Sequence, residues 1–268
     1  MPFLARDGSE LYYETHGAGP ALVFAHGLGG SHLTWWQQVP HFRDRYTCVT
    51  FAHRGFGLSR EAPGGPGPDA FVDDLAALVD HLGLGDVRLV GQSMGGWTCL
   101  GYALRHPDRV RALVLACTTG TLGDPETERL FRAHAAGRPE AALAARGIHP
   151  ACGERMAREQ PALHFLYRAL DALSLDLDKD AVRRRLIQMR TVPRAAVAAL
   201  RMPLLCITGE EDAVIPPAAV AVLQSIVPGA RLARVPETGH SVYWERPENF
   251  NRLVDDFFRD VDGVTRPA

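Results

Sequence analysis

One serine stands among glycines where an apolar run meets a helical pattern. Residues 91–95 read Gly-Gln-Ser-Met-Gly, with Ser93 at the centre, and they follow the strand-like run 88–90. A tight strand-to-helix turn of this GxSxG kind needs neighbours without bulky side chains. It also puts the hydroxyl at a helix N-terminus, where free N–H groups favour developing negative charge. The pattern predicts a nucleophile, and the alternative is a serine that only caps the helix.

A serine hydroxyl is a weak nucleophile at neutral pH, so a histidine must accept its proton and an acid must orient that histidine. Among the eleven histidines, His240 lies in the segment GHSVYWERPENF, between the last predicted strand and the final predicted helix. A loop in that place reaches the carboxyl edge of the sheet, where α/β proteins place their sites. We therefore predict that His240 is the base.

The acid is predicted from its position after another strand. Asp212 directly follows the apolar run 203–208, on the same predicted edge as His240, with Glu210 and Glu211 as alternatives. The loop after the run 112–117 reads TTGTLG and has no carboxylate before Asp124, which favours Asp212.

A glycine-rich loop supplies a third part of the chemistry. Residues 26–30 read His-Gly-Leu-Gly-Gly and follow the apolar run 21–25. Such a loop can direct backbone N–H groups at an oxyanion, and the predicted donors are the N–H groups of Leu28 and Met94. A phosphate-binding loop is disfavoured, because the segment contains neither GxxxxGK[ST] nor GxGxxG.

The elements that must position these residues follow from apolar periodicity. The runs 2–5 and 10–15 flank Asp7-Gly8, a dipeptide that favours a tight hairpin turn. Further strands are predicted at 21–25, 46–51, 88–90, 112–117, 203–208 and 230–235, and helices at 69–82, 94–104, 217–226 and from Pro247 onward. Alternating strands and helices are typical of a parallel sheet covered on both faces.

Residues 121–200 interrupt this alternation with helix-like segments and no convincing strand. We interpret them as an inserted helical lid, and residues 1–120 with 201–268 as the core that carries it. Lid side chains expected to meet the substrate are Phe131, His134, His164, Phe165 and Tyr167. Residues 121–201 carry 14 basic and 10 acidic side chains, so an anionic substrate such as a carboxylated lactone is one interpretation and a solvated arginine-rich surface is the other.

The totals exclude several classes of protein. The 268 residues carry a formal net charge of −2, which gives no general attraction to nucleic acid or to anionic membranes. Five cysteines form no CxxC pair, so no metal site or disulfide framework is indicated and reduced thiols are expected. The chain shows no signal-like segment and no apolar run of membrane-spanning length. We expect a cytoplasmic protein that needs no cofactor and acts on a small molecule; the oligomeric state is not indicated.

The order serine, aspartate, histidine, each after a successive strand, resembles that of the α/β-hydrolase superfamily. The matching segments are HGLGG, RGFGLS at 54–59, GQSMGG, HPDRVRALVL from His106, GEEDAVIPP and GHSVYWERPENF, and they extend over essentially the whole chain. Trp35 occupies a place where these hydrolases often pack a tryptophan behind the oxyanion loop. The resemblance implies a mostly parallel central sheet with helices on both faces and an inserted helical lid.

The resemblance also implies a Ser-His-Asp hydrolase of carboxylic esters or lactones, similar to carboxylesterases and enol-lactonases. A carbon–carbon bond hydrolase or thioesterase on the same triad is the alternative, and a receptor-like protein with little turnover is the alternative of another class. Ser93 in the nucleophile position sets haloalkane dehalogenases and epoxide hydrolases aside.

One position departs from the family pattern. The aspartate that commonly lies two residues before the arginine of RGxGxS is replaced by Ala52 here, and His53 follows it. We expect this change to alter the hydrogen bonds around Arg54 without touching the chemistry, and His53 to be structural or, alternatively, to line the site.

Overall fold

An eight-stranded sheet forms the centre of the protein. The computed structural model describes residues 2–137, 139–174 and 177–263. In space the strands follow the order β1-β2-β4-β3-β5-β6-β9-β10. Their bounds are β1 Phe3–Arg6, β2 Ser9–His16, β3 Ala21–Ala25, β4 Thr47–Phe51, β5 Val87–Gln92, β6 Val110–Ala116, β9 Leu204–Gly209 and β10 Arg231–Val235.

The sheet is antiparallel at its N-terminal edge and parallel elsewhere. β1 pairs antiparallel with β2, and β2 antiparallel with β4, whereas all later neighbours pair in parallel. The predicted hairpin turn is confirmed: Asp7 and Gly8 have φ of 49° and 77°, the positive values that such a turn requires. Parallel strands carry the loops at their carboxyl ends to one edge of the sheet.

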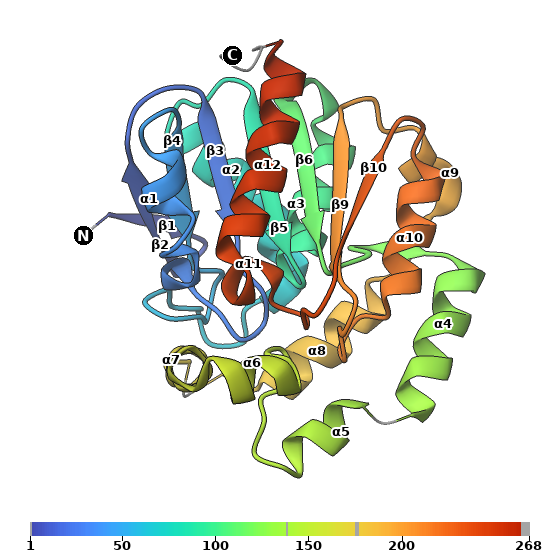
Figure 1. Cartoon of the computed structure of the whole chain (residues 1–268). Coiled ribbons are helices and arrows are strands. Elements are labelled where there is room, and N and C mark those ends of the chain that lie inside the picture. The colour runs from blue at the N-terminus through green and yellow to red at the C-terminus, as the bar shows by residue number, and fades with distance from the viewer. Residues whose placement is uncertain (1, 138, 175–176, 264–268) are drawn as a thin grey trace.

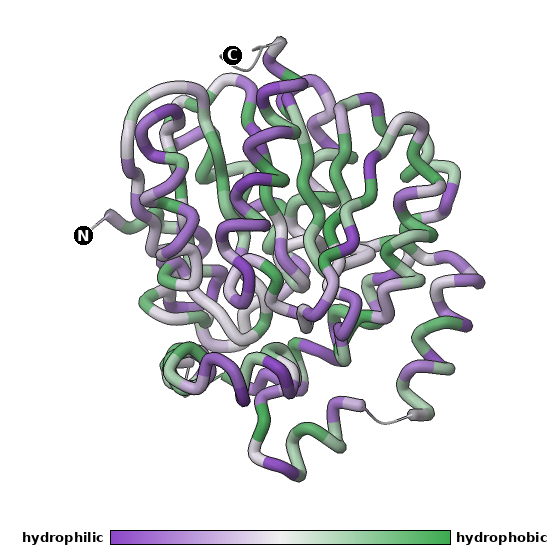
Figure 2. Tube along the Cα trace, in the orientation of Figure 1, coloured by the Kyte–Doolittle hydropathy of each residue, from purple (hydrophilic) through white to green (hydrophobic). Residues whose placement is uncertain are grey.

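Helices cover both faces of the sheet, and each face has its own apolar cluster. Leu75 and Leu100, from α2 and α3, pack with Leu223 of α10 on one face. Phe42 of α1 and Phe250 of α12 pack on the other. These helices are α1 Val39–Phe42, α2 Phe71–His81, α3 Gly95–Arg105, α10 Pro217–Ile226, α11 Val242–Glu245 and α12 Pro247–Asp262 (Figure 1). The inner strands are correspondingly green in the hydropathy colouring of Figure 2.

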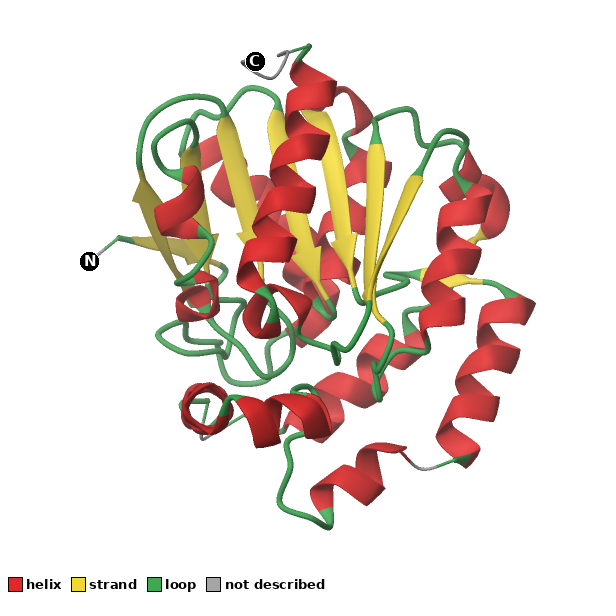
Figure 3. Cartoon of the chain, in the orientation of Figure 1, coloured by secondary structure: helices red, strands yellow, loops and turns green. Residues whose placement is uncertain are grey.

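The segment between β6 and β9 lies below the carboxyl edge of the sheet, as Figures 1 and 3 show. It is mostly helical, as predicted. Its helices are α4 Pro125–Ala136, α5 Pro139–Ala144, α6 Gly153–Glu159, α7 Pro161–Asp171, α8 Lys179–Gln188 and α9 Arg194–Ala198. We call this segment the lid. Among the described residues, no helix combines the length and the apolar character needed to cross a membrane.

The expectation of a lid without strands is wrong at its two ends. β7 Leu122–Gly123 and β8 Val192–Pro193 form a short parallel pair, which joins the beginning of the lid to its end. A side chain at Gly123 would approach the Arg190 carbonyl oxygen to 2.6 Å, so the two segments pack backbone to backbone. Strands of two residues lack the periodicity that sequence patterns detect. Three 3-10 turns, His32–Trp35, Gly67–Ala70 and Pro107–Arg109, complete the described elements.

Candidate active site

The turn that carries Ser93 is sharp. Ser93 has φ of 50°, a left-handed value that is uncommon for a residue with a side chain, and it lies between the end of β5 and the start of α3. Its N–H donates to the Ala116 carbonyl at 2.9 Å, and its carbonyl accepts the N–H of Gly96 at 2.8 Å. The backbone on both sides therefore holds this conformation. A helix cap alone does not require it, because N-cap residues normally have extended backbone.

The glycines around Ser93 are required by close backbone packing. A Cβ atom at Gly95 would lie 2.0 Å from the Ala25 carbonyl oxygen, and one at Gly91 would lie 2.6 Å from the Gly95 carbonyl oxygen. At Gly96 it would lie 2.4 Å from Thr118 Cγ2. Each approach is shorter than any real Cβ contact. At Gly91 and Gly95 the close neighbour is backbone, so the turn requires glycine there, whereas at Gly96 the neighbour is the Thr118 side chain.

His240 and Asp212 are joined by a hydrogen bond. His240 Nδ1 lies 2.8 Å from Asp212 Oδ2, and both residues are almost completely buried. The other carboxylate oxygen of Asp212 accepts the N–H groups of Val214 and Ile215 at 2.8 and 2.9 Å. Because an ionised carboxylate accepts and does not donate, this arrangement places the proton on Nδ1 and leaves Nε2 free to accept another.

The loops that carry these two residues are bonded to each other. The Glu211 N–H donates to the Thr238 carbonyl at 2.9 Å, and a Cβ at Gly209 would lie 2.1 Å from the Gly239 carbonyl oxygen. The Gln92 side chain donates to the His240 carbonyl at 3.2 Å. This bond connects the loop that carries His240, the histidine loop, to the turn at residues 91–95, which we call the elbow. The position of His240 relative to Asp212 is thus set mainly by backbone contacts.

The rival acids lie elsewhere. Glu210 and Glu211 are exposed, and Glu211 forms an ion pair with Arg155 at 2.7 Å. Asp124 caps α4, where it accepts the N–H groups of Glu126 and Thr127. Among these carboxylates, only Asp212 reaches His240.

A buried glutamate that the sequence analysis did not identify binds the backbone of the loop that carries His240. Glu245, in α11, accepts the N–H of Gly239 at 2.9 Å and that of Ser241 at 3.2 Å, the residues on either side of His240. Burial raises the pKa of the Glu245 carboxyl to about 8, against the opposing effect of these hydrogen bonds. The residue is visible in the sequence as the fifth after His240, but its role depends on the fold of α11.

A third buried group adjoins the pair. The Cys117 sulfur, Asp212 and His240 offer ligand atoms within 4.8 Å of one another, the only such metal-competent group found among the described residues. Burial, followed by the Asp212 charge, holds the pKa of the Cys117 thiol well above its usual range, so the sulfur is protonated. A metal ion would have to displace that proton and break the hydrogen bond between His240 and Asp212. The group therefore fits a hydrogen-bonded histidine–carboxylate pair beside a buried thiol better than a metal centre. All five cysteines are buried free thiols.

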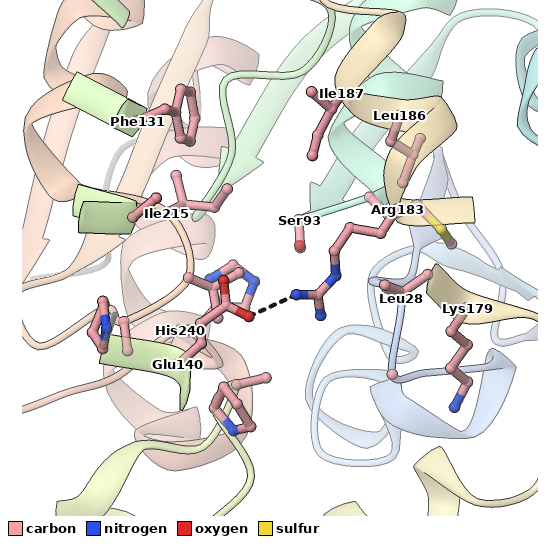
Figure 4. A pocket seen from close by; sticks show the side chains of 18 of the residues that line it. Leu28, Ser93, Phe131, Glu140, Lys179, Arg183, Leu186, Ile187, Ile215 and His240 are labelled. Atoms are coloured by element: carbon pink, nitrogen blue, oxygen red, sulfur yellow. Dashed lines mark hydrogen bonds and ion pairs between the residues drawn. The ribbon is translucent and has the colours of Figure 1, made fainter. Parts of the chain in front are cut away.

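The glycine-rich loop lies against the elbow. A Cβ at Gly27 would lie 3.2 Å from Ser93 Cβ and 2.2 Å from Gln92 Oε1, so the loop and the turn that carries Ser93 are in contact. Leu28 and Met94, the predicted oxyanion donors, both line the cavity that Ser93 and His240 also line (Figure 4). Trp35 is fully buried and packs on Phe24 and Tyr243, as the resemblance implied.

The loop begins at a pair of buried histidines. The His53 backbone N–H donates to His26 Nε2 at 3.0 Å, and His53 Nε2 lies 2.9 Å from the Thr98 hydroxyl. Burial lowers the pKa of His26 to about 3 and that of His53 well below its usual value, so both rings are neutral. His53 is therefore structural and does not line the cavity.

The carboxylate that is missing at Ala52 is replaced, as the partner of Arg54, by one from α2. Arg54 is fully buried, and its guanidinium donates to both carboxylate oxygens of Asp74 in α2, at 2.7 and 2.5 Å. A buried cation needs such a partner. The carboxylate is supplied by a residue distant in sequence, which pattern reading at Ala52 did not predict.

The cavity has a volume of about 790 Å³ and lies between the carboxyl edge of the sheet and the lid. Of the five lid residues proposed from sequence, Phe131, His134 and Tyr167 line it. The expectation is wrong for His164, whose ring accepts the His149 N–H, and for Phe165, which is 73% exposed on the outer side of α7. Both residues lie outside the lining.

Charged lid residues that the sequence analysis missed also face the cavity. Arg183 of α8 and Glu140 of α5 form an ion pair of 2.7 Å, drawn as the dashed line near Ser93 and His240 in Figure 4. Lys179 pairs with Asp171 at 2.7 Å. Neither pair has a sequence signal, because the partners come from different helices.

Comparison with known proteins agrees with this geometry. The family described as alpha/beta hydrolase fold matches residues 20–146. A protein of Caulobacter sp. (strain K31), named "Putative carbamate hydrolase RutD", is 31% identical over 92% of this chain and 95% of its own. The chain belongs to the α/β-hydrolase family. Family membership and this relative together identify it as a hydrolase.

Two solved structures of α/β-hydrolases align over nearly the full length. A thermophilic esterase from Thermogutta terrifontis is 28% identical, with a TM-score of 0.78 over 97% of both chains. Est816, described as an N-acyl homoserine lactone degrading enzyme, is 26% identical, with a TM-score of 0.79 over 96% of this chain and 100% of its own. The α/β-hydrolase fold expected from the sequence is thereby confirmed.

Proposed function

We propose that this α/β-hydrolase cleaves carboxylic esters or lactones through an acyl-enzyme on Ser93. The observation that carries the proposal is the hydrogen bond between His240 Nδ1 and Asp212 Oδ2, beside a cavity that Ser93 and His240 both line. The left-handed backbone of Ser93 supports it, because strain of this kind is maintained at functional sites. The similarity to an esterase and a lactone-degrading enzyme supports the choice of bond.

The mechanism follows from the positions of the protons. His240 Nε2 accepts the proton of the Ser93 hydroxyl as its oxygen attacks the carbonyl carbon, and Asp212 stabilises the imidazolium that forms. The N–H groups of Leu28 and Met94 stabilise the oxyanion, each by about 3 kcal/mol in the transition state. The imidazolium then protonates the leaving alcohol. In the second half, His240 removes a proton from water as the water oxygen attacks the acyl carbon, and the imidazolium returns that proton to Ser93 Oγ as the acyl–oxygen bond breaks and the acid leaves.

The nucleophile is tested with Ser93→Ala and 4-nitrophenyl acetate. We expect turnover to fall to the background of the assay while the circular dichroism spectrum is unchanged, because only the hydroxyl is removed. A fluorophosphonate probe should add one covalent label to the wild type, measured by intact mass, and none to Ser93→Ala. The control is Ser225→Ala, an exposed serine on α10 that bonds to the Val222 carbonyl. Wild-type activity in Ser93→Ala would contradict the proposal.

The type of bond is tested with a substrate panel. Esters, lactones, thioesters, carbamates and vinylogous diketones differ in leaving group but present a similar carbonyl to Ser93. We expect the highest kcat/KM with an ester or lactone. A higher value with the diketone would favour carbon–carbon bond hydrolysis, and labelling of Ser93 without turnover of any substrate would favour a receptor-like protein.

A further inference from the structure

Arg190 is a partly buried cation in the cavity for which the described residues provide no carboxylate partner. Arg183 and Lys179 each pair with a carboxylate, and Arg132 is exposed, so water solvates it. Arg190 lines the same cavity but is half-buried, and within the described residues its guanidinium forms no ion pair or hydrogen bond. Desolvation lowers the pKa of Arg190 to about 10, with no opposing carboxylate. The side chain remains a cation at neutral pH.

Aromatic rings cover the flat surface of this guanidinium. The Arg190 Cζ atom lies 3.7 Å from the ring centroid of Phe131 and 5.3 Å from that of Trp97. Cation–π contacts stabilise the charge but leave the N–H groups at the edge of the plane without acceptors. The Nε atom is buried and has no acceptor in the described structure. The terminal nitrogens, which are not among the buried atoms, are therefore the ones that an anion in the cavity can reach.

The backbone holds Arg190 firmly in this place. Arg190 lies between α8 and β8. Its N–H donates to the Ile187 carbonyl at 3.2 Å, and the nearby Val192 N–H donates to the Thr121 carbonyl at 3.0 Å. The Trp97 indole donates to the Leu186 carbonyl at 2.9 Å, which ties the end of α8 to α3. Trp97 lies in the first turn of α3, directly after the Ser93 elbow. The backbone at Arg190 is therefore tied to the helix that follows Ser93.

We propose that Arg190 binds a free carboxylate of the substrate, so that the enzyme acts on esters or lactones that carry a second, unreacted carboxylate group. This inference rests on the proposed function and names its substrate class. A guanidinium matches a carboxylate in two parallel N–H···O bonds, which orient the molecule as well as hold it. The carboxylates already in the cavity do not occupy this role: Glu140 and Asp171 are paired with other cations, and Asp180 is exposed.

Binding is measured without turnover, so that the result does not depend on the reaction. In a Ser93→Ala background, monomethyl and dimethyl esters of succinate, glutarate and adipate are titrated by calorimetry. The two members of each pair differ by the free carboxylate. We expect at least one monomethyl ester to bind about tenfold or more tightly than its dimethyl ester, the scale of a charge-assisted contact. Adding Arg190→Met should abolish that preference, and Arg190→Lys should retain part of it.

The control is Arg184→Met, which removes the same charge from α8 at an exposed position that does not line the cavity. It should leave the preference unchanged. Replacing an unpaired half-buried cation by an apolar side chain should also leave the melting temperature of Arg190→Met no lower than that of its parent. A lower melting temperature together with an unchanged preference would indicate that Arg190 is purely structural.

The proposal is overturned if no monomethyl ester is preferred, or if the preference persists in Arg190→Met. Failure of the proposed function is a separate result, because a Ser93 that is not a nucleophile still leaves the binding measurement valid. In the catalytically intact chain, the same substitution should lower kcat/KM for the 4-nitrophenyl monoester of adipate at least tenfold more than for 4-nitrophenyl hexanoate.

Discussion

The two sides of the cavity hold their charged groups in different ways. On the core side, His240 and Asp212 are buried, and backbone hydrogen bonds between their loops set their positions. On the lid side, the side chains of Arg183 and Glu140 are 48% and 33% exposed, and one ion pair between two helices joins them. Close-packed interiors leave little freedom to move, whereas exposed ion pairs are weak. The Asp212–His240 pair is therefore held by the backbone around it, whereas the Arg183–Glu140 pair is held only by its own side chains.

The largest expected effect is a loss of kcat when the Asp212–His240 pair on the core side is changed. Asp212→Asn should lower kcat on the order of 10⁴-fold, because an amide no longer fixes the imidazole tautomer or stabilises its charge. Steady-state kinetics with the best ester of the panel measure this. Glu211→Gln, at the neighbouring exposed carboxylate that pairs with Arg155, should stay within about twofold of the wild type. Equal losses in both variants would contradict the assignment of the acid.

The next effect concerns the backbone that supports Ser93. Gly95→Ala should destabilise the fold by about 3 kcal/mol or more, because the added Cβ would lie 2.0 Å from the Ala25 carbonyl oxygen and neither backbone can move freely. Denaturant unfolding measures the change. Gly85→Ala, where an added Cβ meets nothing within 4 Å, should stay within about 0.5 kcal/mol. A tolerant Gly95→Ala would show that the elbow is less tightly packed than described.

The third effect is a pH dependence of the free energy of unfolding that Glu245 should cause and surface carboxylates should not. Its folded pKa, about 8, lies above the ordinary value of 4.5, so the folded state binds the proton more tightly than the unfolded state. The resulting stability is complete below about pH 4.5 and is lost as the pH rises towards 8. The amide of Glu245→Gln does not titrate. Over that range the free energy of unfolding should shift in favour of the variant by about 5 kcal/mol, since a pKa difference of about 3.5 units corresponds to about 1.4 kcal/mol per unit.

Chemical denaturation at several pH values measures the effect of Glu245→Gln. Its control is Glu154→Gln, on an exposed lid carboxylate that pairs with Arg146, for which no such trend is expected. A constant difference between Glu245→Gln and the wild type across the range would mean that the Glu245 carboxyl stays ionised in the folded protein.

The smallest effect is expected on the lid side. Glu140→Gln removes the partner of Arg183 and should change the free energy of unfolding by less than about 1 kcal/mol, because both side chains are partly exposed. Any change should decrease further in high salt. A loss of several kcal/mol would remove the contrast between the two sides of the cavity.

The sequence predicted most of the core. The runs 21–25 and 217–226 coincide with β3 and α10, and the elbow glycines pack as their spacing indicated. Motif positions were readable because their constraints are local: a turn, a strand end or a close backbone approach allows few residue types. The lid was read correctly as helical, but β7 and β8 were missed, and two of its five proposed lining residues, His164 and Phe165, lie elsewhere.

By itself, the sequence determined that Ser93, Asp212 and His240 follow strands in that order along the chain, and thereby the reaction class that we propose. Only the tertiary structure decided that Asp74 binds Arg54, that Glu245 holds the His240 loop, and that Arg190 lies in the cavity with no carboxylate partner among the described residues. The physical reason is the separation along the chain of the residues that interact. Backbone geometry is encoded by neighbouring residues, whereas the environment of a charge depends on groups that folding brings together from distant parts of the chain.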